Sequence, residues 1–68
     1  MIKFIKVTDA ITGNRMLINT DIIATVEKTI KSTNESCTAV SRVTFKDNRA
    51  DEFAEESVDY FAKFLLDS

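Results

Sequence analysis

The stretch that decides the fold class reads Ile22-Ile23-Ala24-Thr25-Val26-Glu27-Lys28-Thr29-Ile30. Its even positions are mostly apolar and, after Ile23, its odd positions are polar, which is the two-residue period of a strand with one buried face. The run from Cys37 to Phe45 alternates in the same way and is rich in Thr and Val. A polar loop at 32–36 separates the two runs. The pair therefore predicts an antiparallel hairpin.

A first hairpin is expected before this pair, with one strand over 2–8, a turn around Gly13 and a return strand at 16–18. The apolar side chains of 2–8 fall on both faces of that strand, so the buried face is ambiguous and either a bulge or cover on both sides is required. After Phe45, residues 47–48 (Asp-Asn) predict a tight turn. A short fifth strand over 49–53 follows.

The period changes at Ser57, which predicts a helix. Ser57 is a suitable N-cap, and Asp59 lies in the first turn at the positive end of the helix dipole. The apolar side chains that follow at helical spacing are Val58, Phe61, Ala62 and Leu65. We therefore predict an α+β fold in a single small domain, residues 1–68. About five antiparallel strands in residues 1–53, a small curled sheet or open barrel, precede one C-terminal amphipathic helix over 57–67.

The residue inventory excludes several kinds of chemistry. The chain has no His and one Cys, so it lacks an imidazole base, the usual zinc ligands and an internal disulfide. Cys37 is in phase with Ala39 and Val43, which predicts a buried core thiol. We expect no catalytic residue, no metal, no cofactor and no enzymatic activity. With no long apolar tract and no signal-like start, we also expect no membrane span and a cytoplasmic location.

Charge is divided unevenly along the chain. Residues 1–46 carry seven basic and four acidic side chains, +3, whereas residues 47–68 carry two and seven, −5. Arg42 and Lys46, on the polar face of the sheet, are candidates for binding phosphate, and the strand-and-helix plan is similar to that of the carbon storage regulator family of RNA-binding proteins. Nucleic acid is disfavoured, because this face lacks aromatic side chains and carries Glu27.

The acidic side chains near the helix start form a second candidate cluster. They are Asp51, Glu52, Glu55, Glu56 and Asp59. Carboxylates can hold a divalent cation or imitate nucleic acid, but no EF-hand spacing is present, and a solvated hairpin end accounts for the same residues. Asn19 is a further candidate for binding, although holding a turn through its side chain would also explain it.

One segment resembles a known family. The run Ile18-Asn19-Thr20-Asp21-Ile22-Ile23-Ala24-Thr25-Val26-Glu27 resembles the Asn-x-Asp-x-Ile-x-x-Ile-Glu segment of FlbD-like small bacterial proteins, which are associated with flagella and swarming. Residues 43–48 and 56–59 occupy the places of that family's strand, turn and helix start. The resemblance implies the same fold and a flagellar or motility role. Similar small proteins occur in phage genomes.

The helix has more apolar surface than one small sheet can bury. Tyr60, Phe64 and Leu66 extend its apolar side, which predicts an interface with a protein partner or a homo-oligomer, unless loops or the first hairpin cover the two rings. A chain this short often needs such association. We therefore expect a non-catalytic interaction module. The alternatives are a phage-encoded inhibitor or small-ligand sponge, and an RNA- or DNA-binding regulator of the carbon storage regulator type.

Overall fold

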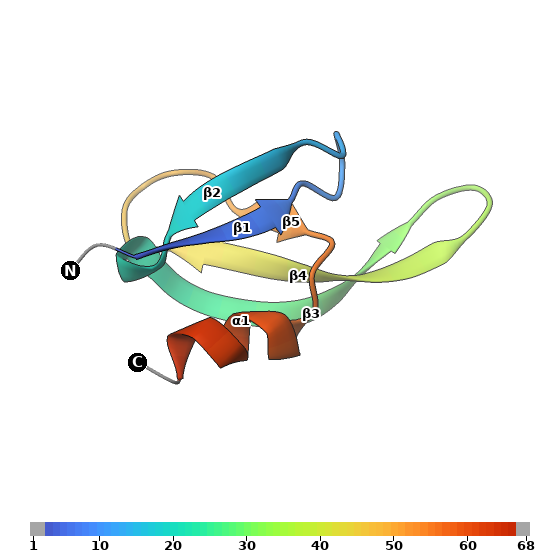
Figure 1. Ribbon diagram of the computed structural model, residues 1–68. Coiled ribbons are helices and arrows are strands. Elements are labelled where there is room, and N and C mark those ends of the chain that lie inside the picture. The colour runs from blue at the N-terminus through green and yellow to red at the C-terminus, as the bar shows by residue number, and fades with distance from the viewer. Residues whose placement is uncertain (1–2, 67–68) are drawn as a thin grey trace.

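Within the part of the chain that the structure describes, five strands and one C-terminal helix make up the fold, as predicted (Figure 1). A computed structural model of the chain describes residues 3–66. The elements in order are β1 (Phe4–Thr8), β2 (Arg15–Asn19), a 3-10 turn η1 (Thr20–Ile22), β3 (Ile23–Ser32), β4 (Cys37–Phe45), β5 (Glu52–Ala54) and α1 (Val58–Leu65). Ile2 and Asp67, which the sequence placed in the first strand and the helix, lie outside the described residues.

The first hairpin pairs β1 and β2 antiparallel in an unbroken register, so no bulge is needed. Ile5 and Val7 are buried, whereas Phe4 is 55% exposed, and this settles which face of β1 is the inner one. Gly13 takes the turn position with φ 78°, in the left-handed region where a Cβ would add strain.

The second hairpin, β3 and β4, is long and projects beyond the rest of the fold (Figure 1). A register shift between Ile23 and Thr25 moves Ile23 into the core, whereas the simple alternation put it on the polar face. Near the tip, Cys37 and Ala39 are exposed and Ile30 is 55% exposed. The prediction of a buried Cys37 thiol is therefore wrong, because the strand pattern continues past the end of the layer that covers it.

The turn after β4 is also different from the prediction. No residue other than glycine has a positive φ in the stretch 3–66, so Asp47 and Asn48 do not form a tight primed turn. The connection is instead a wider loop in which the Asp47 carboxylate pairs with the Arg49 guanidinium at 2.9 Å. As a result, β5 begins at Glu52 and not at Arg49.

The two sheets are joined where β1 ends. Asp9 forms an antiparallel bridge with Ala54, and the Glu55 N–H donates to the Thr8 carbonyl at 2.9 Å. The strands therefore follow the spatial order β2, β1, β5, β4, β3, in a sheet that curls without closing.

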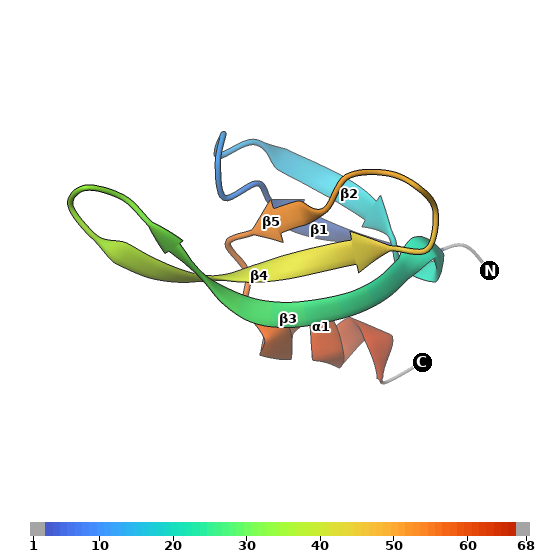
Figure 2. The same cartoon turned by 180° about the vertical axis from the view of Figure 1, so that it is seen from behind.

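The helix α1 covers the concave side of this sheet (Figures 1 and 2). The Ser57 side chain caps it by accepting from the Tyr60 N–H at 3.2 Å, as predicted. Phe61 is fully buried at the centre. The core residues around it are Ile5, Val7, Ile18, Ile23, Val43 and Ala54. Within residues 3–66, no helix is long and apolar enough to cross a membrane.

Candidate interaction surface

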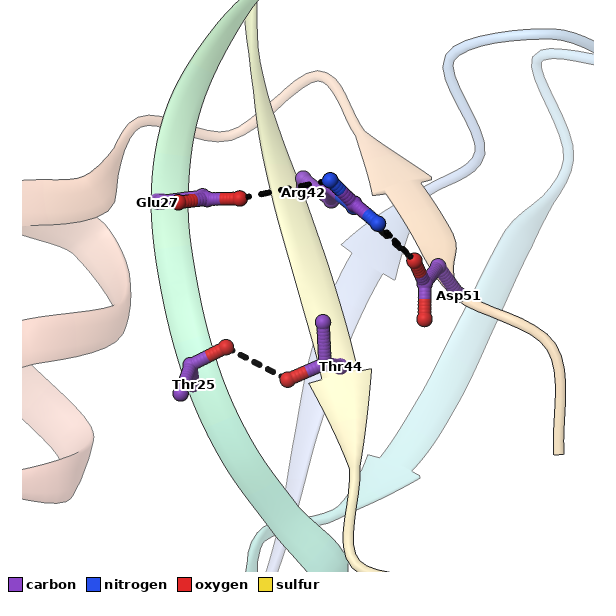
Figure 3. A network of polar contacts seen from close by, with 5 residues as sticks. All are labelled: Thr25, Glu27, Arg42, Thr44 and Asp51. Carbon is purple, nitrogen blue, oxygen red and sulfur yellow. Dashed lines mark hydrogen bonds and ion pairs between the residues drawn. The ribbon is translucent and has the colours of Figure 1, made fainter. Parts of the chain in front are cut away.

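Arg42 lies on the sheet face opposite the helix, inside a polar network (Figure 3). Its Nη2 is 2.7 Å from Asp51 Oδ2, its Nε donates to the same oxygen at 2.8 Å, and its Nη1 is 3.5 Å from Glu27 Oε1. The hydrogen bond that Arg42 donates to Asp51, followed by the negative charge of Asp51, raises the pKa of Arg42. Nearby, the hydroxyls of Thr25 and Thr44 are hydrogen-bonded across the strands. The charge of Arg42 is therefore engaged within the chain and is poorly placed to attract phosphate.

Asn19 and Lys46 do not join Arg42 in one site. The Asn19 side chain accepts from the Asp21 N–H at 2.9 Å and so caps η1. It also lies at one side of a groove of about 380 Å³ that includes Phe4 and Phe45. The Lys46 backbone donates to the Ile22 carbonyl at 2.7 Å, and its side chain is exposed. Of the three residues proposed for binding, none touches another through a hydrogen bond or ion pair in the described region.

The acidic cluster is separated into single carboxylates with different roles. Asp51 binds Arg42, and Glu56 accepts from the Thr8 N–H at 2.8 Å and the Thr8 hydroxyl at 2.9 Å. Glu55 and Asp59 are exposed. Within residues 3–66, no group of three His, Cys, Asp or Glu side chains is arranged to hold a metal ion.

Glu52 is the most perturbed acid of the described chain. It is half-buried on β5 near Asp9, and its buried Oε2 accepts no hydrogen bond within residues 3–66. Desolvation, then the hydrogen bond and charge of Asp9, raises the pKa of Glu52 to about 7. The N–H groups of Thr12 and Ile11 lower the pKa of Asp9. Below about pH 7 the proton of this pair therefore lies on Glu52, which can then donate to Asp9.

The Asp9–Glu52 pair predicts that the free energy of unfolding decreases as the pH rises from mildly acidic to alkaline. The pKa of Glu52 is raised from 4.5 in the unfolded chain to about 7 in the folded protein. The stabilisation that the bound proton gives is therefore complete below pH 4.5 and is lost as the pH rises through about 7. We expect Glu52→Gln to match the wild type near pH 5 and to be more stable near pH 8.5. The expected gain is on the order of 1 kcal/mol, after discounting for partial exposure.

Urea unfolding at both pH values measures this effect. Glu55→Gln is the matched control, because Glu55 is an exposed acid of the same segment, and its substitution should leave the urea midpoint nearly unchanged. A Glu52→Gln effect of equal size at both pH values would contradict protonation of Glu52 as the cause.

Tyr60 and Phe64 lie on the flank of α1 that faces β1. Their rings are in edge contact with centroids 5.0 Å apart, and the Tyr60 hydroxyl donates to the Lys6 carbonyl at 2.5 Å. Both side chains are partly buried against the core. The first hairpin thus covers part of the two rings, whereas Leu66 at the helix C-terminus is 79% exposed.

The other flank of α1 faces β3 across an open apolar groove of about 410 Å³. From the strand it is lined by Ile23, Ala24, Thr25 and Val26, and from the helix side by Val58, Phe61, Ala62, Leu65 and Leu66. Within the described chain, β3 pairs with β4 alone, so no strand lies along its outer edge (Figure 2). The groove and the open edge therefore form one continuous surface, which we call the β3–α1 groove.

Sequence reasoning missed this groove. The helical spacing predicts that Val58, Ala62 and Leu65 share one apolar face with Phe61, and in the structure all four line the groove. Phe61 takes the central position, however, and leaves the other three at the margin of the sheet. The sequence signal was the wide apolar arc of the helix, but it could not indicate which side of that arc stays open.

Comparison of the chain with protein-family models, with curated proteins and with solved structures finds no match.

Proposed function

We propose that this protein is a small, non-catalytic, cytoplasmic interaction module that acts by self-association or by binding a protein partner, with the β3–α1 groove as its contact surface. The observation that carries the proposal is that the edge of β3 with no strand beside it in residues 3–66 borders an apolar groove that ends at the exposed Leu66. Strand addition beside a helix is a recurrent way to bind protein segments, in which backbone hydrogen bonds supply affinity and side-chain pockets supply specificity.

The charged face of the sheet supports this choice over nucleic acid. Arg42 is neutralised by Asp51 and approached by Glu27, so the face offers fewer free cations than its sequence suggests. The net charge of the whole chain is −2, which opposes attraction to phosphate. The flagellar or motility setting remains a proposal that rests on the resemblance to FlbD-like proteins.

Leu66→Lys is the variant that tests the groove. Leu66 is exposed and follows the last helical turn, where a lysine is compatible with the helix dipole, so the fold should be unaffected. Phe64 is a poorer probe, because it also packs against the core. If the groove is the contact surface, we expect Leu66→Lys to weaken self-association or partner binding about tenfold or more, as loss of a buried leucine does.

Sedimentation equilibrium of wild type and variant provides the measurement. Leu17→Lys is the control, since Leu17 is 61% exposed on β2, outside the groove, and its substitution should not change association. A Leu66→Lys protein that associates as strongly as the wild type would contradict the groove as the contact surface.

A further inference from the structure

The outer edge of β3 has a fixed pattern of available backbone groups. At the hairpin tip the Thr33 N–H donates to the Ser36 carbonyl at 2.8 Å, and the register then places Lys31 opposite Thr38. Hydrogen-bonded pairs alternate along an antiparallel ladder, so the odd-numbered residues of β3 direct their backbone groups toward β4. The even-numbered residues direct theirs outward. Those in the regular part of the strand are Val26, Lys28, Ile30 and Ser32.

We propose that the occupant of this edge is a second copy of the chain, which pairs β3 antiparallel with β3 about a two-fold axis at Thr29. The inference rests on the proposed function, and it deepens it by naming the partner and the register. In a symmetric pair, outward-directed groups must meet outward-directed groups, so an even residue must lie opposite an even residue. This parity rule leaves few registers.

Charge decides among them. An axis at Lys28 would place Lys28 opposite itself, and an axis at Glu27 would place Glu27 opposite itself, each with like charges in direct contact. An axis at Val26 would carry the pairing into the irregular segment between Ile23 and Thr25. An axis at Ile30 avoids these conflicts but opposes no unlike charges.

The axis at Thr29 places Glu27 opposite Lys31 of the second copy, and symmetry repeats this pair. Both residues lie on the sheet face opposite the helix. Glu27 has a 3.5 Å contact with Arg42, and Lys31 donates to the Ala10 carbonyl with one of its three N–H groups. Each side chain therefore retains capacity for a partner across the new strand pair.

The same register also covers the exposed Ile30. On the helix side it places Ile30 of one copy opposite Lys28 of the other. Lys28 borders a hollow of about 370 Å³ toward β4 and the start of α1, so the isoleucine would pack against the outer side of the Lys28 side chain. An exposed β-branched residue near an open strand edge thus gains cover from the dimer.

A charge-exchange experiment tests the register. Glu27→Lys alone places two lysines opposite each other at both symmetric pairs, and Lys31→Glu alone places two glutamates there. We expect each variant to dimerise about tenfold more weakly than the wild type. An equimolar mixture of the two restores both unlike pairs, so we expect a heterodimer with an affinity near that of the wild type. Sedimentation velocity, with one variant labelled, measures the mixture.

The mixture distinguishes a change at the interface from a change in the fold. Adding one variant cannot repair the folding of the other, so recovered dimerisation would come from the contact between the two copies. Ile30→Lys is an additional probe at a position whose exposure makes it tolerant in the monomer. It would face Lys28 of the second copy, and we expect it to weaken the dimer while Leu17→Lys does not.

Each outcome is decisive. Recovery of the dimer on mixing supports the axis at Thr29. A wild type that stays monomeric at high micromolar concentration overturns the second copy as occupant. The proposed function would then require a different protein as the partner that binds the groove. A wild-type dimer that Leu66→Lys weakens, but that mixing of the charge variants does not restore, overturns the register and leaves the β3–α1 groove as the contact surface.

Discussion

Phe61→Ala is expected to leave most of the chain unfolded in water at 25 °C. Phe61 is fully buried at the point where α1 meets both hairpins. Removing a buried phenylalanine ring costs about 3–5 kcal/mol. Because a domain of this length has a total stability of only about 3–10 kcal/mol, the loss removes most of it. Far-UV circular dichroism and urea titration measure the effect.

Phe4→Ala is the matched control for this experiment. Phe4 lies on the adjacent strand β1 but is 55% exposed, so the same truncation should cost about 1 kcal/mol or less. Phe61→Ala with a urea midpoint equal to that of Phe4→Ala would contradict the placement of Phe61 at the centre of the core.

Glu56→Ala is expected to produce the second largest loss, about 1.5–3 kcal/mol, although Glu56 is one of several acids in its segment. Its carboxylate accepts from both the N–H and the hydroxyl of Thr8, which lies forty-eight positions away along the chain. These charge-assisted bonds connect the end of β1 to the segment that leads into α1. Without them the Thr8 N–H loses its acceptor at the junction between the two sheets.

Glu55→Ala is the control for Glu56→Ala, and urea unfolding compares the two. The Glu55 side chain is exposed, and the contribution of this residue to the junction is its backbone N–H bond to the Thr8 carbonyl, which alanine retains. We expect a change within about 0.5 kcal/mol for Glu55→Ala. Equal losses for the two variants would show that the Glu56 carboxylate does not hold the junction.

The strands, the helix and their order could be predicted from local features of the sequence. Alternation over 22–30 and 37–45 specifies two strands, because successive side chains of a strand point to opposite faces. Ser57 specifies the helix start, because its side chain can accept a backbone N–H of the first turn without help from the rest of the fold. These features depend on neighbours a few positions away, so they can be recognised without knowing the tertiary structure.

The tertiary structure alone decided which parts of these elements are covered and which charges meet. Cys37 and Ile30 follow the strand pattern as well as Val43 does, yet they are exposed because the long hairpin extends beyond α1. The acids near the helix start share one short segment, but the curl of the sheet brings Glu56 to Thr8 and Glu52 to Asp9. The free edge of β3 is likewise set by which strands lie beside it. Such contacts join residues distant in sequence, and local patterns carry no information about how far a sheet curls or where its cover ends.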